Sequence, residues 1–139
     1  MHMNKSIIRH GFILIFLALV GGLFVPMMQV PRLGLSAHTI GVLSGVLMIA
    51  IGAIWSLFSL STKQLRWLSF AWLYSSYMNW LGCVIGATLG TGTSTPIVSA
   101  GLVGSALSEN LVASILMSVG IASIFAVLMS LWGLRHHTE

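Results

Sequence analysis

Four long stretches of apolar residues, separated by short polar segments, dominate the chain. They run roughly over residues 11–28, 35–60, 65–89 and 111–134. Each is about as long as an α-helix must be to cross a ~30 Å hydrocarbon core at 1.5 Å per residue. The pattern therefore predicts an all-α protein, a single domain over residues 1–139 that crosses a membrane four times as a helix bundle.

The segments between the apolar stretches carry turn signals. Pro26 and Pro31 mark the exit of the first stretch, because proline cannot continue the hydrogen-bond ladder of a helix. The polar residues 61–64 predict a tight turn before the third stretch, and a loop rich in Gly, Ser and Thr spans residues 90–110.

The composition agrees with a membrane protein and excludes several other classes. Of 139 residues, 57% are hydrophobic and 6% are charged, whereas a soluble domain carries about 25% charged residues. Cys83 is the only cysteine, so no internal disulfide can form. No basic patch is interleaved with aromatic residues, and the net charge of +4 fits the flanks of membrane helices. We therefore expect no nucleic-acid partner.

The basic residues predict the orientation of the four helices. Arg32 stands alone between the first and second stretches, and all other Lys and Arg residues fall on the opposite side of the predicted membrane. Those on that side are Lys5, Arg9, Lys63, Arg66 and Arg135. Because cytoplasmic loops carry an excess of Lys and Arg, both termini are expected in the cytoplasm.

Small residues recur at helical spacing on the predicted spans. Gly41 and Gly45 lie one turn apart on the second stretch, as do Gly82 and Gly86 on the third. In lipid, helices pack through small residues that let their backbones approach. The glycines predict close packing within one bundle, contacts between subunits, or both.

Few polar side chains fall inside the predicted spans, and such groups are often functional. His38 lies one turn into the second stretch, where a neutral imidazole suits a metal ion or haem iron. The alternative is an interfacial histidine that reaches water or a backbone carbonyl. Asn79 lies in the middle of the third stretch, where its amide either joins two helices or orients a ligand.

Helical spacing groups these candidates. Asn79 and Cys83 share one face of the third helix, and His38, Gly41 and Gly45 share one face of the second. If the two faces meet, the glycines would leave room for a flat ligand near the outer leaflet. His10 falls at the other membrane surface, so one subunit would not place both histidines on one metal ion.

Several kinds of site are missing from the sequence. It contains no Gly-rich phosphate loop for a nicotinamide or flavin nucleotide, no cluster of Cys or carboxylate ligands for zinc, and no acid near a serine for a hydrolytic triad. A small transporter would need an ionisable group within a span, whereas Glu109 falls at a loop end. A haem-bearing anchor for an electron-transfer partner would offer two axial histidines for each haem. Both classes remain alternatives.

Several motifs, taken together, resemble the bacterial hydroxylaminobenzene mutases over essentially the whole chain. These are the run Val30–His38, the segment Tyr77–Trp80, the loop residues Gly90–Gly92 with Pro96-Ile97, and the ends Arg9–Gly11 and Leu131–Leu134. More distantly, the chain is similar to the membrane-bound styrene oxide isomerases. The resemblance implies an isomerase of the bacterial inner membrane that converts hydroxylaminobenzene to 2-aminophenol by intramolecular hydroxyl transfer.

The resemblance also implies a cofactor and a set of site residues. Styrene oxide isomerases are trimers that hold haem b between subunits, with an axial histidine that matches His38 and an iron that acts as a Lewis acid. We accordingly expect a homotrimer, haem b on His38, and catalytic contacts from Asn79 and Ser44. Cofactor contacts are expected from Gly41, Gly45, Tyr77 and Cys83.

Two of these positions depart from the family pattern. The isomerases have an asparagine where this chain has Ser44, and a tyrosine where it has Cys83. Many mutases carry Glu and Asn where this chain has Ile40 and Ser44. The resemblance therefore implies a retained iron ligand with altered substrate contacts.

Overall fold

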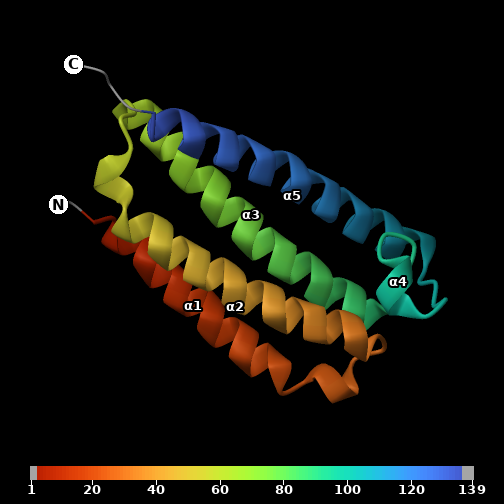
Figure 1. Cartoon of the computed structure of the whole chain (residues 1–139). Coiled ribbons are helices and arrows are strands. Elements are labelled where there is room, and N and C mark those ends of the chain that lie inside the picture. The colour runs from red at the N-terminus through yellow and green to blue at the C-terminus, as the bar shows by residue number, and fades with distance from the viewer. Residues whose placement is uncertain (1–2, 136–139) are drawn as a thin grey trace.

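The computed structural model describes residues 3–135, and helices make up most of this part of the chain (Figure 1). Within these residues there is no β-strand, so the prediction of an all-α protein is confirmed. The elements are α1 (Lys5–Gly22), the 3₁₀ turn η1 (Val25–Met27), α2 (Pro31–Ala53), the 3₁₀ turn η2 (Trp55–Leu57), α3 (Thr62–Leu89), α4 (Pro96–Ser99) and α5 (Ala106–Gly133).

The four long helices lie side by side in an antiparallel row. α1 packs against α2, α2 against α3, and α3 against α5, and α1 also touches α3 at a few residues (Figure 1). The described chain begins and ends at the same end of this row, where η2 also lies. We call this the basic end, because Lys5, Lys63, Arg66 and Arg135 gather there; α4 and Arg32 lie at the opposite, loop end.

Three of the described helices, α1, α2 and α5, are long and apolar enough to cross a membrane. α3 has 28 residues, as many as α5, and lies between α2 and α5. Its lower hydropathy reflects polar residues such as Ser75, Ser76 and Asn79. Two of them, Ser75 and Ser76, are buried within the row rather than exposed at its surface.

The ends of the first two helices differ from the predicted stretches. α1 begins at Lys5 rather than near residue 11, because the Asn4 side chain caps it by accepting a hydrogen bond from the Ile7 amide at 3.2 Å. It ends at Gly22, and Pro26 lies in η1. α2 begins at Pro31, a first-turn position where no amide donor is needed.

The later helices also begin earlier than predicted. Residues 61–64 are not a separate turn, because Ser61 and Gln64 cap each other at the start of α3. α5 begins at Ala106, inside the predicted loop, because the Ser105 hydroxyl accepts a hydrogen bond from the Ser108 amide at 3.2 Å. The rest of that loop contains the short helix α4.

Glycines bring α1 and α2 into backbone contact, as their spacing predicted. A Cβ atom added to Gly45 would lie 2.6 Å from the Gly11 carbonyl oxygen, and one added to Gly11 would lie 2.6 Å from the Gly45 carbonyl oxygen. A Cβ atom at Gly41 would lie 2.5 Å from that of Ala18. Any larger side chain at these positions would force the two helices apart.

Glu109 organises the loop between α3 and α5. Its Oε1 accepts hydrogen bonds from the amides of Gly92 at 2.9 Å and Gly104 at 2.8 Å, and its Oε2 accepts one from Thr93 at 3.0 Å. The side chain is buried, with 8% of its surface exposed. Glu109 is therefore a structural group that holds the two halves of the loop together.

We expect Glu109→Ala to lower the melting temperature clearly, since it leaves the amides of Gly92, Thr93 and Gly104 without their acceptor. Thermal unfolding in detergent measures the change. Asn110→Ala is the matched control, because Asn110 is the exposed neighbour of Glu109. Equal melting temperatures for the two variants would contradict the structural role of Glu109.

Candidate functional site

The imidazole of His38 is fixed by a backbone group of the neighbouring helix. Its Nδ1 lies 2.9 Å from the carbonyl oxygen of Ala18 on α1, and this carbonyl can only accept a hydrogen bond. Nδ1 must therefore carry the proton, and a neutral ring then has its free lone pair on Nε2. This is the arrangement in which a histidine binds a metal through Nε2.

Gly22, in the last turn of α1, makes the space for this ring. A Cβ atom added to Gly22 would lie 2.6 Å from Nδ1 of His38 and 3.2 Å from its Cε1. The adjacent Gly21 differs, because a Cβ atom there would meet only the Trp80 ring, at an ordinary 3.8 Å. Ala18 and Gly22 are thus positioning residues for His38 that sequence spacing did not identify.

His38 is half-buried at the border between the α1–α2 contact and an uncovered side of α2. On that side the large apolar residues are exposed: Leu35 to 59%, Val46 to 53% and Leu43 to 63%. Leu35 precedes His38 by one turn and Val46 follows it by two. A ligand on Nε2 of His38 would therefore have an apolar helix surface beside it.

Asn79 and Ser44 are half-buried and have no side-chain hydrogen-bond partner among residues 3–135. Some hydroxyl groups on these helices bond to the carbonyl four residues earlier, as Thr39 does to Leu35 at 3.1 Å and Thr88 to Val84 at 2.8 Å, whereas Ser69 and Ser76, like Ser44, do not. The amide of Asn79 and the hydroxyl of Ser44 therefore remain available to a ligand.

Cys83 belongs to the apolar core between α2 and α3. It is buried and packs in one cluster with Ala37, Leu33 and Ala87. Ala37 directly precedes His38 on α2, so Cys83 and His38 lie at a similar height along the row. Ala37 packs toward α3, whereas His38 bonds to α1. Within one copy, Cys83 is thus packed against other residues, and no hydrogen bond joins it to His38.

Tyr77 contacts His10 on α1. Its hydroxyl donates to the His10 carbonyl at 3.2 Å and lies 3.1 Å from His10 Nδ1, and the two rings meet edge to face with centroids 5.8 Å apart. His10 precedes Ala18 by eight residues, or about 12 Å along the helix. Within one copy of the chain, the structure thus brings Tyr77 to His10, while His38 on α2 meets α1 further along, at Ala18.

The space beside Gly41 and Gly45 is occupied by other residues of the same chain. At Gly41 an added Cβ atom would meet Ala18 and, at 2.7 Å, Cδ1 of Trp80; at Gly45 it would meet Ile15 and the Gly11 backbone. Packing accounts for both glycines, and they leave no room for a flat ligand in one copy. Their contact with a cofactor stays a prediction.

No group of three His, Cys, Asp or Glu residues that could hold a metal ion occurs within residues 3–135. Among these residue types, a metal at His38 would therefore have fewer than three protein ligands from the described part of one copy. Such an arrangement fits a metal whose other positions are filled by a macrocycle, as in haem proteins with one protein ligand.

Comparisons with known proteins give the same family as the sequence motifs. The family model for styrene oxide isomerase matches residues 3–135. Hydroxylaminobenzene mutase HabB of Ectopseudomonas oleovorans is 36% identical over 133 residues, covering 94% of this chain and 80% of the relative. Hydroxylaminobenzene mutase HabA of the same organism is 34% identical over 125 residues, covering 89% and 92%. No solved structure matches the chain.

We expect Gly22→Ala to displace the His38 ring from Ala18, because the added methyl group would lie only 2.6 Å from Nδ1. In the NMR spectrum of ¹⁵N-histidine-labelled protein in detergent, the ring nitrogen shifts of His38 should be those of the Nδ1–H tautomer. The His38 signals are the ones that disappear in His38→Ala. Gly22→Ala should change these shifts, whereas the adjacent control Gly21→Ala should keep them. Unchanged His38 shifts in Gly22→Ala would show that Gly22 does not position the ring.

Proposed function

This chain belongs to the styrene oxide isomerase family and is an isomerase, and we propose that it converts hydroxylaminobenzene to 2-aminophenol by intramolecular transfer of the hydroxyl group. The observation that carries the proposal is the identity of 36% and 34% to two hydroxylaminobenzene mutases over nearly the whole chain. Both of those relatives are mutases by name, whereas the family model is named for an epoxide isomerase.

We further propose that the chain crosses the bacterial inner membrane four times, with both termini in the cytoplasm. Three helices have the length and hydropathy of spans, and α3 lies between two of them with matching length. The concentration of Lys and Arg at the basic end supports a cytoplasmic basic end. Arg32 and α4 would then lie at the outer surface.

Haem b is the cofactor that we propose for His38, in a site that a homotrimer completes. The single histidine with a free Nε2 lone pair fits an axial haem ligand. The apolar side of α2 beside it is exposed in one copy, so a second copy would have to cover a bound macrocycle. When bound, the iron would supply a Lewis acid that polarises the substrate.

The residues of the chain would bind and orient the substrate. The reaction breaks the N–O bond, forms a C–O bond at the ortho carbon, and returns the ring proton to nitrogen, so atoms and electrons balance without a further reactant. The unpartnered Asn79 amide and Ser44 hydroxyl would hydrogen-bond the migrating hydroxyl. No contact joins them to His38 within one copy, so we place the substrate where neighbouring copies meet. Apolar side chains there would restrict water.

Membranes that contain the protein should convert hydroxylaminobenzene to 2-aminophenol without an added electron donor, oxygen or nucleotide cofactor. In ¹⁸O-labelled water, the product should carry almost no label, because the oxygen never leaves the substrate. Substantial label would show that water attacks a released intermediate. Absence of any turnover in haem-loaded protein would contradict the assigned substrate.

A substitution at Asn79 tests whether this residue orients the substrate or only packs in the fold. Asn79→Ala should lower kcat by about tenfold or more, as expected for the loss of one hydrogen bond to a reacting group, while haem content stays at the wild-type level. A parallel loss of haem and activity would instead make Asn79 a packing residue.

Purified wild-type protein should show a Soret band near-stoichiometric with protein, and His38→Ala should lose it while the chain still inserts into membranes. His10→Ala is the control, because His10 is held by Tyr77 about 12 Å from the level of Ala18 along α1. It should retain the Soret band. Full haem content in His38→Ala would remove the proposed ligand.

A further inference from the structure

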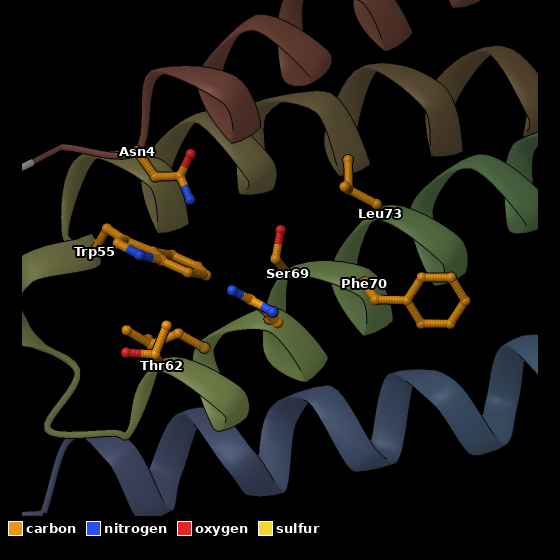
Figure 2. A pocket seen from close by; sticks show the side chains of 8 residues that line it. Asn4, Trp55, Thr62, Ser69, Phe70 and Leu73 are labelled. Atoms are coloured by element: carbon orange, nitrogen blue, oxygen red, sulfur yellow. The ribbon is translucent and has the colours of Figure 1, made fainter.

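Three neighbouring hollows lie around the first turns of α3, near the basic end of the row. The first, of about 460 Å³, lies among the start of α1, η2 and the start of α3 (Figure 2). Its lining is largely polar and aromatic, with Asn4, Trp55, Thr62 and Ser69 turned toward the space, and Arg66 also lines it.

Two further hollows adjoin the first around α3. The second, of about 480 Å³, is lined by Lys63, Arg66, Trp67 and Phe70, and so shares Arg66 and Phe70 with the first. The third, of about 380 Å³, lies between α3 and α5 and shares Trp67 and Phe70 with the second. The three hollows thus adjoin one another around the first turns of α3, and we call them together the groove; its cations, Lys63 and Arg66, lie at the basic end.

The α3–α5 part of the groove has an apolar character. Small residues, Ala71, Ser118 and Ala122, line it together with the aromatic or branched side chains of Trp67, Phe70, Ile121 and Phe125. Ser118 keeps its own hydroxyl engaged, since it lies 2.8 Å from the Tyr74 hydroxyl and donates to the Ile115 carbonyl at 2.7 Å. Trp67, Phe70 and Ile121 are 60%, 58% and 69% exposed.

The positive charge of Lys63 and Arg66 indicates that the groove binds an anionic molecule. Lys63 and Arg66 form no ion pair within residues 3–135, where the only acid is Glu109, bound to loop amides at the far end of the molecule. The described part of a second copy could offer these cations no other carboxylate. An anionic lipid offers a phosphate at the membrane surface and an acyl chain below it, and Phe70 follows Lys63 by about 10 Å along the helix.

We propose that this groove binds one anionic phospholipid, with its phosphate on Lys63 and Arg66 and an acyl chain between α3 and α5. The proposal rests on the cytoplasmic orientation of the basic end proposed above, and on neither the haem nor the reaction. Its test measures bound lipid, so it can fail while the isomerase assignment stands.

Native mass spectrometry of the detergent-purified protein, mixed with phosphatidylglycerol and phosphatidylcholine of identical acyl chains, tests the headgroup contact. The wild type should retain phosphatidylglycerol in clear excess. The double variant Lys63→Gln/Arg66→Gln should lower this retention roughly fivefold for each cation removed. Arg32→Gln, which removes an exposed cation at the loop end, should leave it unchanged. Equal retention by the wild type and the double variant would overturn the proposal.

A second pair of variants tests the acyl chain. Ala122→Leu fills the groove and should lower retention of phosphatidylglycerol, whereas Gly120→Leu on the same helix should not, because a Cβ atom at Gly120 meets nothing within 4 Å. Unchanged retention in Ala122→Leu would overturn the acyl assignment. Efficient disulfide-linked dimers of Phe125→Cys in native membranes would place a second copy in the groove and overturn the lipid proposal as a whole.

Discussion

The close approach of α1 to α2 is the constraint on which the rest of the candidate site depends. Gly11 and Gly45 place backbone against backbone, and Gly41 admits the methyl group of Ala18. At this separation the Ala18 carbonyl is within 2.9 Å of Nδ1 of His38, and Gly22 leaves room for the ring. The tautomer of His38 is thus set by helix spacing and by no charged or polar side chain.

Polar side chains without a hydrogen-bond partner point to places where a ligand or a second copy could bind. Most hydroxyl groups on the long helices bond to a carbonyl of their own helix or to a neighbouring helix, as Ser130 does to Ala126 at 2.8 Å while accepting from Trp72 Nε1 at 3.1 Å. Such bonds stabilise the row and leave nothing for a ligand. Asn79 and Ser44 lack partners among the described residues, and a polar group without a partner in an apolar medium is costly unless a ligand or a second copy completes it.

The large features of the fold could be predicted from the sequence because each depends on a local pattern. Apolar length predicts the helices, and the distribution of Lys and Arg predicts which ends lie together. The start of α1 could not be placed, since it depends on one cap, the Asn4 side chain. Ser61 and Gln64 have the spacing of a capping box, but a run of polar residues is also typical of a turn, so the sequence pattern did not distinguish the two.

The candidate site was predictable only in part, for a different physical reason. His38 and Asn79 are visible in the sequence as polar residues inside apolar stretches, and spacing shows which residues share a face of one helix with them. Which face meets which neighbour depends on the rotation of each helix in the row, and periodicity within one helix does not encode it. The pairing of Tyr77 with His10, and the roles of Ala18 and Gly22, follow from that rotation. The only advance signal was the Gly21-Gly22 pair near the end of the first apolar stretch.

The two competing functional classes can be weighed on the same contacts. A proton-coupled transporter needs an ionisable group that changes partners during the cycle, whereas Glu109 is bound to three amides of a loop at the end of the row. An electron-transfer anchor of the usual kind clamps each haem between two histidines. His10 and His38 cannot form such a clamp in one copy, because Tyr77 holds His10 and His38 bonds to Ala18, about 12 Å further along α1. The haem proposed for His38 would receive one imidazole from a copy of the chain, which would suit a Lewis acid that must reach substrate better than an electron carrier.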